Sequence, residues 1–200
     1  MADEYTQLLK LQPNNRWLWY RAAVVQAHLG NQEEYRRLCR EMLERFGNTD
    51  DPDIAESTCK TCVLLALGTE DRNKLARLFD LWVTKQPDHP GRPWLLMTRG
   101  LVDYRAGHGA DAAGRLEKSL AKQPPVYVQA SAHFVLAMTQ ERQGQGEAAR
   151  ATLARAREIT EQQVPTLEKS GWYWHDWLIN DLLRREVESL PGSTGPEPKK

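Results

Sequence analysis

The sequence has few cysteines, no net charge and no long hydrophobic run. Three cysteines in 200 residues are too few for a disulfide framework, which favours a reducing compartment. The 27 Lys and Arg residues balance 27 Asp and Glu residues, so no net field attracts nucleic acid or an anionic membrane. No segment approaches the roughly 20 apolar residues of a membrane span, and the polar start MADEYTQLLKLQPNNRW is unlike a signal peptide. We expect a cytoplasmic protein that binds neither nucleic acid nor membrane.

Motifs for catalysis and metal binding are also missing. The five histidines fall in no HExxH or similar ligand spacing. Cys59 and Cys62 form a single CxxC without the second ligand pair that zinc needs, so packing in a helix core is favoured over a redox or metal role. The run GHGADAAG from Gly107 lacks the Lys-Ser/Thr and the preceding strand of a phosphate-binding loop. We predict no enzyme activity, no metal and no cofactor.

An internal repeat marked by glycine is the main positive feature. Gly30, Gly68, Gly107 and Gly144 are separated by 38, 39 and 37 residues, and each ends one apolar-periodic segment and precedes another. Glycine at such a place is typical of the residue that takes a left-handed conformation after a helix. The period predicts four helical hairpins in a row.

Helix signals place the helices of each hairpin. Asp51 before Pro52 indicates a helix N-cap followed by proline in the first turn. No segment shows the alternation of a strand, so we predict an all-α domain over residues 1–190. A disordered tail over 191–200 should follow, because PGSTGPEPKK has no apolar residue to bury. We expect first helices over 16–29, 53–67, 93–106 and 126–143, and second helices over 32–46, 72–86, 109–123 and 146–163.

The stretch SGWYWHDWL, from Ser170, is compatible with a Ser-His-Asp triad, an aromatic ligand cage or a helix that closes the fold. Neighbours on a helix point about 100° apart, so we expect His175 and Asp176 not to pair, which argues against the triad. Apolar residues recur at helical spacing over about 174–190. We therefore favour a C-terminal capping helix there.

One face of this capping helix should be polar and the other should pack. The side expected to face water carries Asn180, Asp181, Arg184, Arg185 and Glu188. Trp177 is the aromatic residue expected to be buried, and its replacement by alanine should then cost roughly 3–5 kcal/mol.

Small residues at fixed distances from the glycines give the hairpins a resemblance to tetratricopeptide repeats. The pattern has a small residue seven before the inter-helix glycine and another five after it. Gly100 and Ala112 fill these places in the third hairpin, and Ala137 and Ala149 in the fourth. The first two hairpins are degenerate, since Tyr35 stands where a small residue is usual in the first and the second needs a longer turn before Ala76. The resemblance implies a right-handed superhelical array of about four helix-turn-helix repeats with a C-terminal capping helix.

A narrower resemblance covers most of the chain. The runs FGNTDDPDIAESTCKTCVLL, HPGRPWLLMTRGLVDYRAG and YWHDWLINDLLRREVESL are similar to the C-terminal region of large planctomycete-type bacterial proteins, often behind a serine/threonine kinase domain or a WD40 propeller. The chain has no kinase Gly-rich loop, VAIK-type lysine, HRD or DFG motif, so no kinase activity carries over. The resemblance implies a bacterial source and keeps open an accessory role in a larger protein.

The tetratricopeptide resemblance also implies a binding surface along the first helices. In chaperone-binding members a lysine and an asparagine clamp a terminal carboxylate, whereas none of the corresponding positions here is basic or an amide. Either an apolar or amphipathic partner docks on these positions, or other helices of the same protein cover them. The candidate partner-binding residues are Tyr20, Val24, Met97, Leu101, Phe134 and Met138.

Together these features predict a non-catalytic protein-protein interaction or scaffolding module. Its partner would be a protein or peptide segment that docks on an apolar surface, and such association should persist at high salt. The alternative is an accessory fragment of a kinase or WD40 protein whose activity lies outside this chain.

Overall fold

The computed structural model describes residues 2–65, 74–80, 91–163 and 171–191. Every regular element in these ranges is a helix, which confirms the all-α prediction. The chain forms two compact units, Met1–Pro90 and Gly91–Lys200. The predicted tail lies outside the described residues beyond Pro191.

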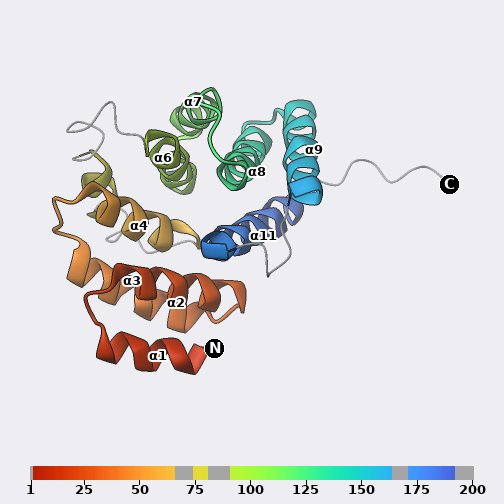
Figure 1. Cartoon of the computed structure of the whole chain (residues 1–200). Helices are drawn as coiled ribbons and strands as arrows, with labels where there is room; N and C mark the ends of the chain where they lie inside the picture. The colour runs from red at the N-terminus through yellow and green to blue at the C-terminus, as the bar shows by residue number, and fades with distance from the viewer. Residues whose placement is uncertain (1, 66–73, 81–90, 164–170, 192–200) are drawn as a thin grey trace. The chain divides into compact units, whose positions relative to one another are not determined.

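The first unit contains helices α1 (Ala2–Leu11), α2 (Arg16–His28), α3 (Gln32–Phe46) and α4 (Pro52–Val63). Helix α1 packs on α2, α2 pairs with α3, and α4 contacts both α2 and α3 (Figure 1). Residues 74–80 are helical and fall within the second helix predicted over 72–86, whose remaining residues lie outside the described ranges.

Local sequence explains where α4 begins. The Asp51 carboxylate accepts hydrogen bonds from the backbone N–H groups of Asp53, at 2.9 Å, and Ile54, at 3.1 Å. Pro52 occupies the first turn, where its missing N–H costs nothing. The predicted N-cap is confirmed.

The second unit contains two antiparallel hairpins and a C-terminal helix. Helix α6 (Arg92–Ala106) pairs with α7 (Gly109–Leu120), and α8 (Val126–Arg142) pairs with α9 (Gly146–Gln163). Helix α8 also contacts α6 and α7, so the hairpins stack side by side (Figure 1). A short 3-10 turn, η1 (Gly171–Tyr173), leads into α11 (Trp174–Glu188), which packs on α8 and confirms the predicted capping helix.

The repeating glycines take the backbone conformation that the sequence predicts. Gly30, Gly107 and Gly144 follow α2, α6 and α8 with φ of 79°, 85° and 73°, a region that side-chain-bearing residues rarely adopt. Gly68 lies outside the described residues. Three of the four inter-helix turns are therefore confirmed at their glycine.

Gly100 allows α6 and α7 to approach closely. A Cβ atom added there would lie 2.6 Å from Cγ of Leu116, which is fully buried on α7. Any larger residue here would force the Leu116 side chain to shift within a packed core. The small residue seven before the inter-helix glycine thus has a packing role.

Replacing Gly100 with alanine should destabilise the second unit by about 1–3 kcal/mol, because the new methyl group overpacks a buried contact. Gly114→Ala is the matched control, since nothing lies within 4 Å of its added Cβ. That change should be neutral or stabilise α7 by about 0.5–1 kcal/mol through helix propensity. Urea denaturation of both variants measures the difference, and equal stabilities would contradict the close contact.

Candidate protein-binding face

The six candidate partner-binding residues are buried in the folded chain. Tyr20, Val24, Phe134 and Met138 have 0% exposure. Leu101 has 1% exposure and Met97 has 3%. A partner therefore reaches these side chains only where neighbouring helices separate, and the prediction that a partner contacts them stays a prediction.

In the second unit, one face of α8 carries two of these residues and is contacted by α11. Tyr127, Ser131, Phe134 and Met138 recur at intervals of four, three and four residues, which places them on one side of the helix. The exposures of Tyr127 and Ser131 are 8% and 3%, and both contact α11. The C-terminal helix thus lies on the side of α8 to which the tetratricopeptide resemblance assigns the binding surface.

A buried amide fixes the position of α11 on α8. The Ser131 hydroxyl donates to Oδ1 of Asn180 at 2.6 Å, and Nδ2 of Asn180 donates to the Tyr127 carbonyl at 3.0 Å. Asn180 is only 2% exposed. The expectation that Asn180 faces water is therefore wrong, because α8 supplies partners for both ends of its amide.

A partly buried ion pair links α11 to α6. Nη1 and Nη2 of Arg105 both donate to the Glu186 carboxylate, with Nη2 to Oε2 at 2.6 Å. The two side chains are 11% and 27% exposed, so water screens the pair less than a surface pair. On α6, Arg105 lies one turn beyond Leu101 and two turns beyond Met97, on the same side of the helix.

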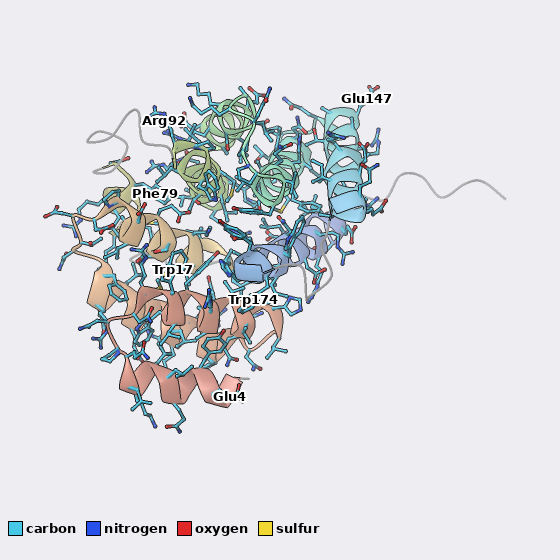
Figure 2. All side chains as sticks on the ribbon, viewed as in Figure 1. Glu4, Trp17, Phe79, Arg92, Glu147 and Trp174 are labelled. Atoms are coloured by element: carbon cyan, nitrogen blue, oxygen red, sulfur yellow. The ribbon has the colours of Figure 1, made fainter. Side chains whose placement is uncertain are left out.

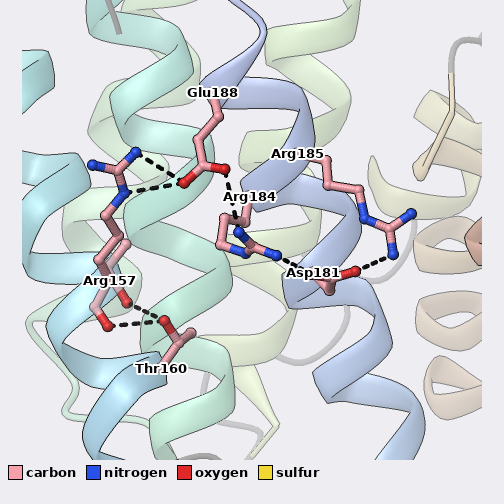
Figure 3. Close-up of polar contacts among 7 residues, drawn as sticks. Arg157, Thr160, Asp181, Arg184, Arg185 and Glu188 are labelled. Atoms are coloured by element: carbon pink, nitrogen blue, oxygen red, sulfur yellow. Dashed lines mark hydrogen bonds and ion pairs between the residues drawn. The ribbon is translucent and has the colours of Figure 1, made fainter. Parts of the chain in front are cut away.

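A second ion pair links α11 to α9. Arg157 Nε and Nη2 donate to Oε1 of Glu188 at 3.0 and 2.9 Å, and Arg184 Nη1 donates to the other Glu188 oxygen at 3.3 Å (Figure 3). Further along α11, Arg184 and Arg185 both pair with Asp181. Charged residues therefore border the apolar contact surface of α11.

Aromatic rings gather where α11 begins. Tyr127 stacks on Tyr173 with ring centroids 4.9 Å apart, and meets Trp94 and Trp177 edge-on at 6.4 and 6.5 Å. Trp177 is only partly buried, so the expectation that it is a buried aromatic is wrong, and Tyr173 is 49% exposed. Trp174 stands in the first turn of α11 (Figure 2). The rings pack against one another and join α11 to the start of α8, which is the structural role expected of a capping element.

His175 and Asp176 do approach each other, contrary to the sequence-based expectation. Nε2 of His175 lies 3.3 Å from Oδ2 of Asp176. The angle of about 100° between neighbours on a helix therefore does not keep the outer imidazole nitrogen from the carboxylate. The exposures of His175 and Asp176 are only 2% and 7%, and Ser170 lies outside the described residues. The pair therefore lies within the packed first turn of α11.

His133 is a partly buried titratable group on α8. Burial lowers the pKa of His133 below its usual 6.5, and the charge of Arg155 on α9 lowers it further. Its Nδ1 atom is buried without a hydrogen-bond partner. The neutral imidazole is therefore the form that suits the folded state.

The stability of the second unit should fall as the pH drops through 6.5 toward the lower folded-state pKa, because the unfolded chain binds a proton on His133 more readily. Replacing His133 with glutamine should remove this part of the pH dependence. His108→Gln, at an exposed position, should leave it unchanged. Thermal denaturation at pH 7.5 and pH 5.5 measures both, and identical pH profiles for the wild type and His133→Gln would contradict the assignment.

All three cysteines are buried thiols in the first unit. Sγ of Cys62 lies 3.7 Å from the Cys39 carbonyl oxygen, and Sγ of Cys59 lies 3.7 Å from the Leu75 carbonyl oxygen. The Tyr35 hydroxyl, beside them, donates to the Thr61 carbonyl at 2.8 Å. Burial, followed by the neighbouring Cys39 and Cys62, raises the pKa of Tyr35 well above 10. These contacts match the core role predicted for the cysteines.

The thiols should be inert in the native protein. With exposures of 0–1%, Cys39, Cys59 and Cys62 should not react with a thiol reagent over minutes, while all three should react in guanidinium chloride. Spectrophotometric thiol titration measures both states. Rapid native labelling, or stoichiometric zinc in the purified protein, would contradict core packing.

The described residues contain no group of three or more His, Cys, Asp or Glu side chains placed to hold a metal ion. Among the helices of the same residues, none has the length and apolarity required to cross a membrane.

The two hairpins of the second unit have a recognisable family pattern. Residues 97–164 match the tetratricopeptide repeat family model. The match begins within α6, covers α7 and α8, and extends through α9, so this region is tetratricopeptide-like. No curated protein and no solved structure gives a significant match to the chain. The family resemblance expected from Gly100, Ala112, Ala137 and Ala149 is therefore confirmed for these hairpins.

Proposed function

We propose that the chain is a non-catalytic module for protein-protein interaction or scaffolding. The match of residues 97–164 carries the proposal, because tetratricopeptide repeats generally mediate protein-protein interaction. Stacked helical hairpins present extended surfaces to partners and are not tied to any one chemistry. The partner is a protein or peptide segment.

A cytoplasmic, bacterial setting is part of this proposal. The small, odd number of cysteines and their burial as free thiols support a reducing compartment. The similarity of YWHDWLINDLLRREVESL to planctomycete-type proteins supports the bacterial source.

The same run supports one alternative, in which the chain is the accessory C-terminal region of a larger serine/threonine kinase or WD40 protein. The reading frame of the gene distinguishes this alternative from an independent interaction module. An open reading frame that continues upstream of Met1 into a kinase or propeller domain supports the alternative, whereas an in-frame stop codon directly upstream rejects it.

Affinity capture from native cytosol tests the interaction role. The immobilised full chain should retain a defined protein that rebinds in purified form, and this association should persist at high salt if apolar contacts dominate. The heat-unfolded chain and an unrelated helical-repeat protein serve as controls. Retention no greater than on these controls, or a turnover assigned to the chain itself, would overturn the proposal.

A further inference from the structure

Helix α11 lies where the resemblance places a partner of the second unit. Asn180 bonds Ser131 and Tyr127 on the face of α8 that also carries Phe134 and Met138. Glu186 bonds Arg105, on the side of α6 that carries Leu101. The candidate positions of this unit therefore lie on helix faces that α11 contacts.

The contacts of α11 define what this face recognises. Ile179, Leu183 and Val187 recur every four residues and are 1–2% exposed, so they form the apolar side of the helix. Asn180 satisfies the Ser131 hydroxyl and the Tyr127 carbonyl. Two arginines of the hairpins form ion pairs with carboxylates of α11: Arg105 on α6 pairs with Glu186, and Arg157 on α9 pairs with Glu188.

We propose that this face is a helix-binding site that α11 occupies as an internal ligand, and that a partner helix of the same chemistry replaces it. Such a helix carries apolar residues at positions i, i+4 and i+8, an amide at i+1 and a carboxylate at i+7. Charge complementarity favours a partner helix with an acidic C-terminal half, because Arg105 and Arg157 lie where the C-terminal half of α11 binds. This inference rests on the proposed protein-binding function and names its partner class and its regulation.

Tethering makes α11 a strong competitor. Only residues 164–173 separate α9 from α11 in the sequence, so the effective concentration of α11 at its own binding face is of millimolar order. The apparent Kd of a free helix equals its intrinsic Kd divided by the fraction of chains in which α11 has left this face. A substitution that weakens the binding of α11 to this face, without changing the face itself, should therefore strengthen binding of the free helix.

A synthetic peptide of residues 174–190, carrying a fluorophore, tests this with the full chain. Glu186→Gln in the chain removes the charge that meets Arg105 and should tighten binding of the wild-type peptide by about 10-fold. Glu158→Gln is the matched control, because Glu158 pairs only three residues away with Arg155 on the exposed side of α9. That variant should bind the peptide as the wild-type chain does.

A charge reversal provides the second measurement. The Arg105→Glu chain should prefer a Glu186→Arg peptide to the wild-type peptide by about 10-fold, whereas the wild-type chain should show the opposite preference. Circular dichroism establishes that each variant is folded. Equal affinity of folded Glu186→Gln and Glu158→Gln chains for the peptide, or no reversal of preference, would overturn the inference.

Capture from cytosol separates this inference from the broader function. A partner retained equally by wild-type and Glu186→Gln chains would leave the interaction role standing and reject the displacement of α11. Peptide binding with the predicted preferences, but no cytosolic partner, would support the helix-binding site and count against the interaction function. Enriched capture by Glu186→Gln supports both.

Discussion

Replacing Phe134 with lysine is expected to unfold the second unit. Phe134 is 0% exposed on the central helix α8, so the substitution places an ammonium group in a packed apolar site. Burial of an unpaired charge, added to the loss of an aromatic core residue, should cost more than about 5 kcal/mol. That cost equals the lower limit of the stability of an ordinary domain. Thermal denaturation followed by circular dichroism should show no cooperative transition of this unit.

Ala148→Lys is the control for this prediction. Ala148 is exposed on α9, and its replacement should change stability by no more than about 0.5 kcal/mol. A Phe134→Lys chain with wild-type thermal stability would mean that Phe134 faces solvent. The candidate partner-binding positions would then form an open surface on which a partner docks, instead of being covered by other helices of the same protein.

Replacing Leu183 with alanine is expected to release α11. Leu183 is 1% exposed and lies between Ile179 and Val187 on the packed side of the helix. Loss of its buried methyl groups should cost about 2–5 kcal/mol, because the surrounding side chains only partly fill the space. The change should appear as a lower denaturation midpoint and as faster amide hydrogen exchange along α11.

Two alanine substitutions on the same helix provide comparisons. Leu182→Ala, one residue away and only partly buried, should cost about 1 kcal/mol or less. Trp177→Ala should cost less than Leu183→Ala, because Trp177 is also only partly buried and meets Tyr127 edge-on. A larger effect at Leu182 than at Leu183 would show that α11 presents a different side to α8.

Local sequence signals predicted the helices and turns well. Asp51 caps α4, and Gly107 takes a positive φ between α6 and α7, because these preferences depend on only a few neighbouring atoms. The capping helix predicted over 174–190 is α11, which ends two residues earlier. Helix α1 was not predicted, since Ala2–Leu11 precedes the glycine repeat and has no turn signal of its own.

The sequence could not show whether the binding face is open or covered, because this depends on contacts between residues far apart in the chain. Helix α8 is buried on nearly every side, so its sequence does not show which side meets α11. Asn180 looks like a surface residue until Ser131 and Tyr127, about 50 positions earlier, are brought beside it. Such long-range pairing leaves no periodic signal in either helix.

The measurement that tests the account most directly is solution NMR of the intact chain at the Asn180 amide. If α11 occupies the face of α8, the Nδ2 protons of Asn180 should show nuclear Overhauser effects to Ser131 and Tyr127 and should exchange slowly with water, since the amide is buried and hydrogen-bonded. Rapid exchange of these protons, with Overhauser effects only to residues of α11, would contradict the account.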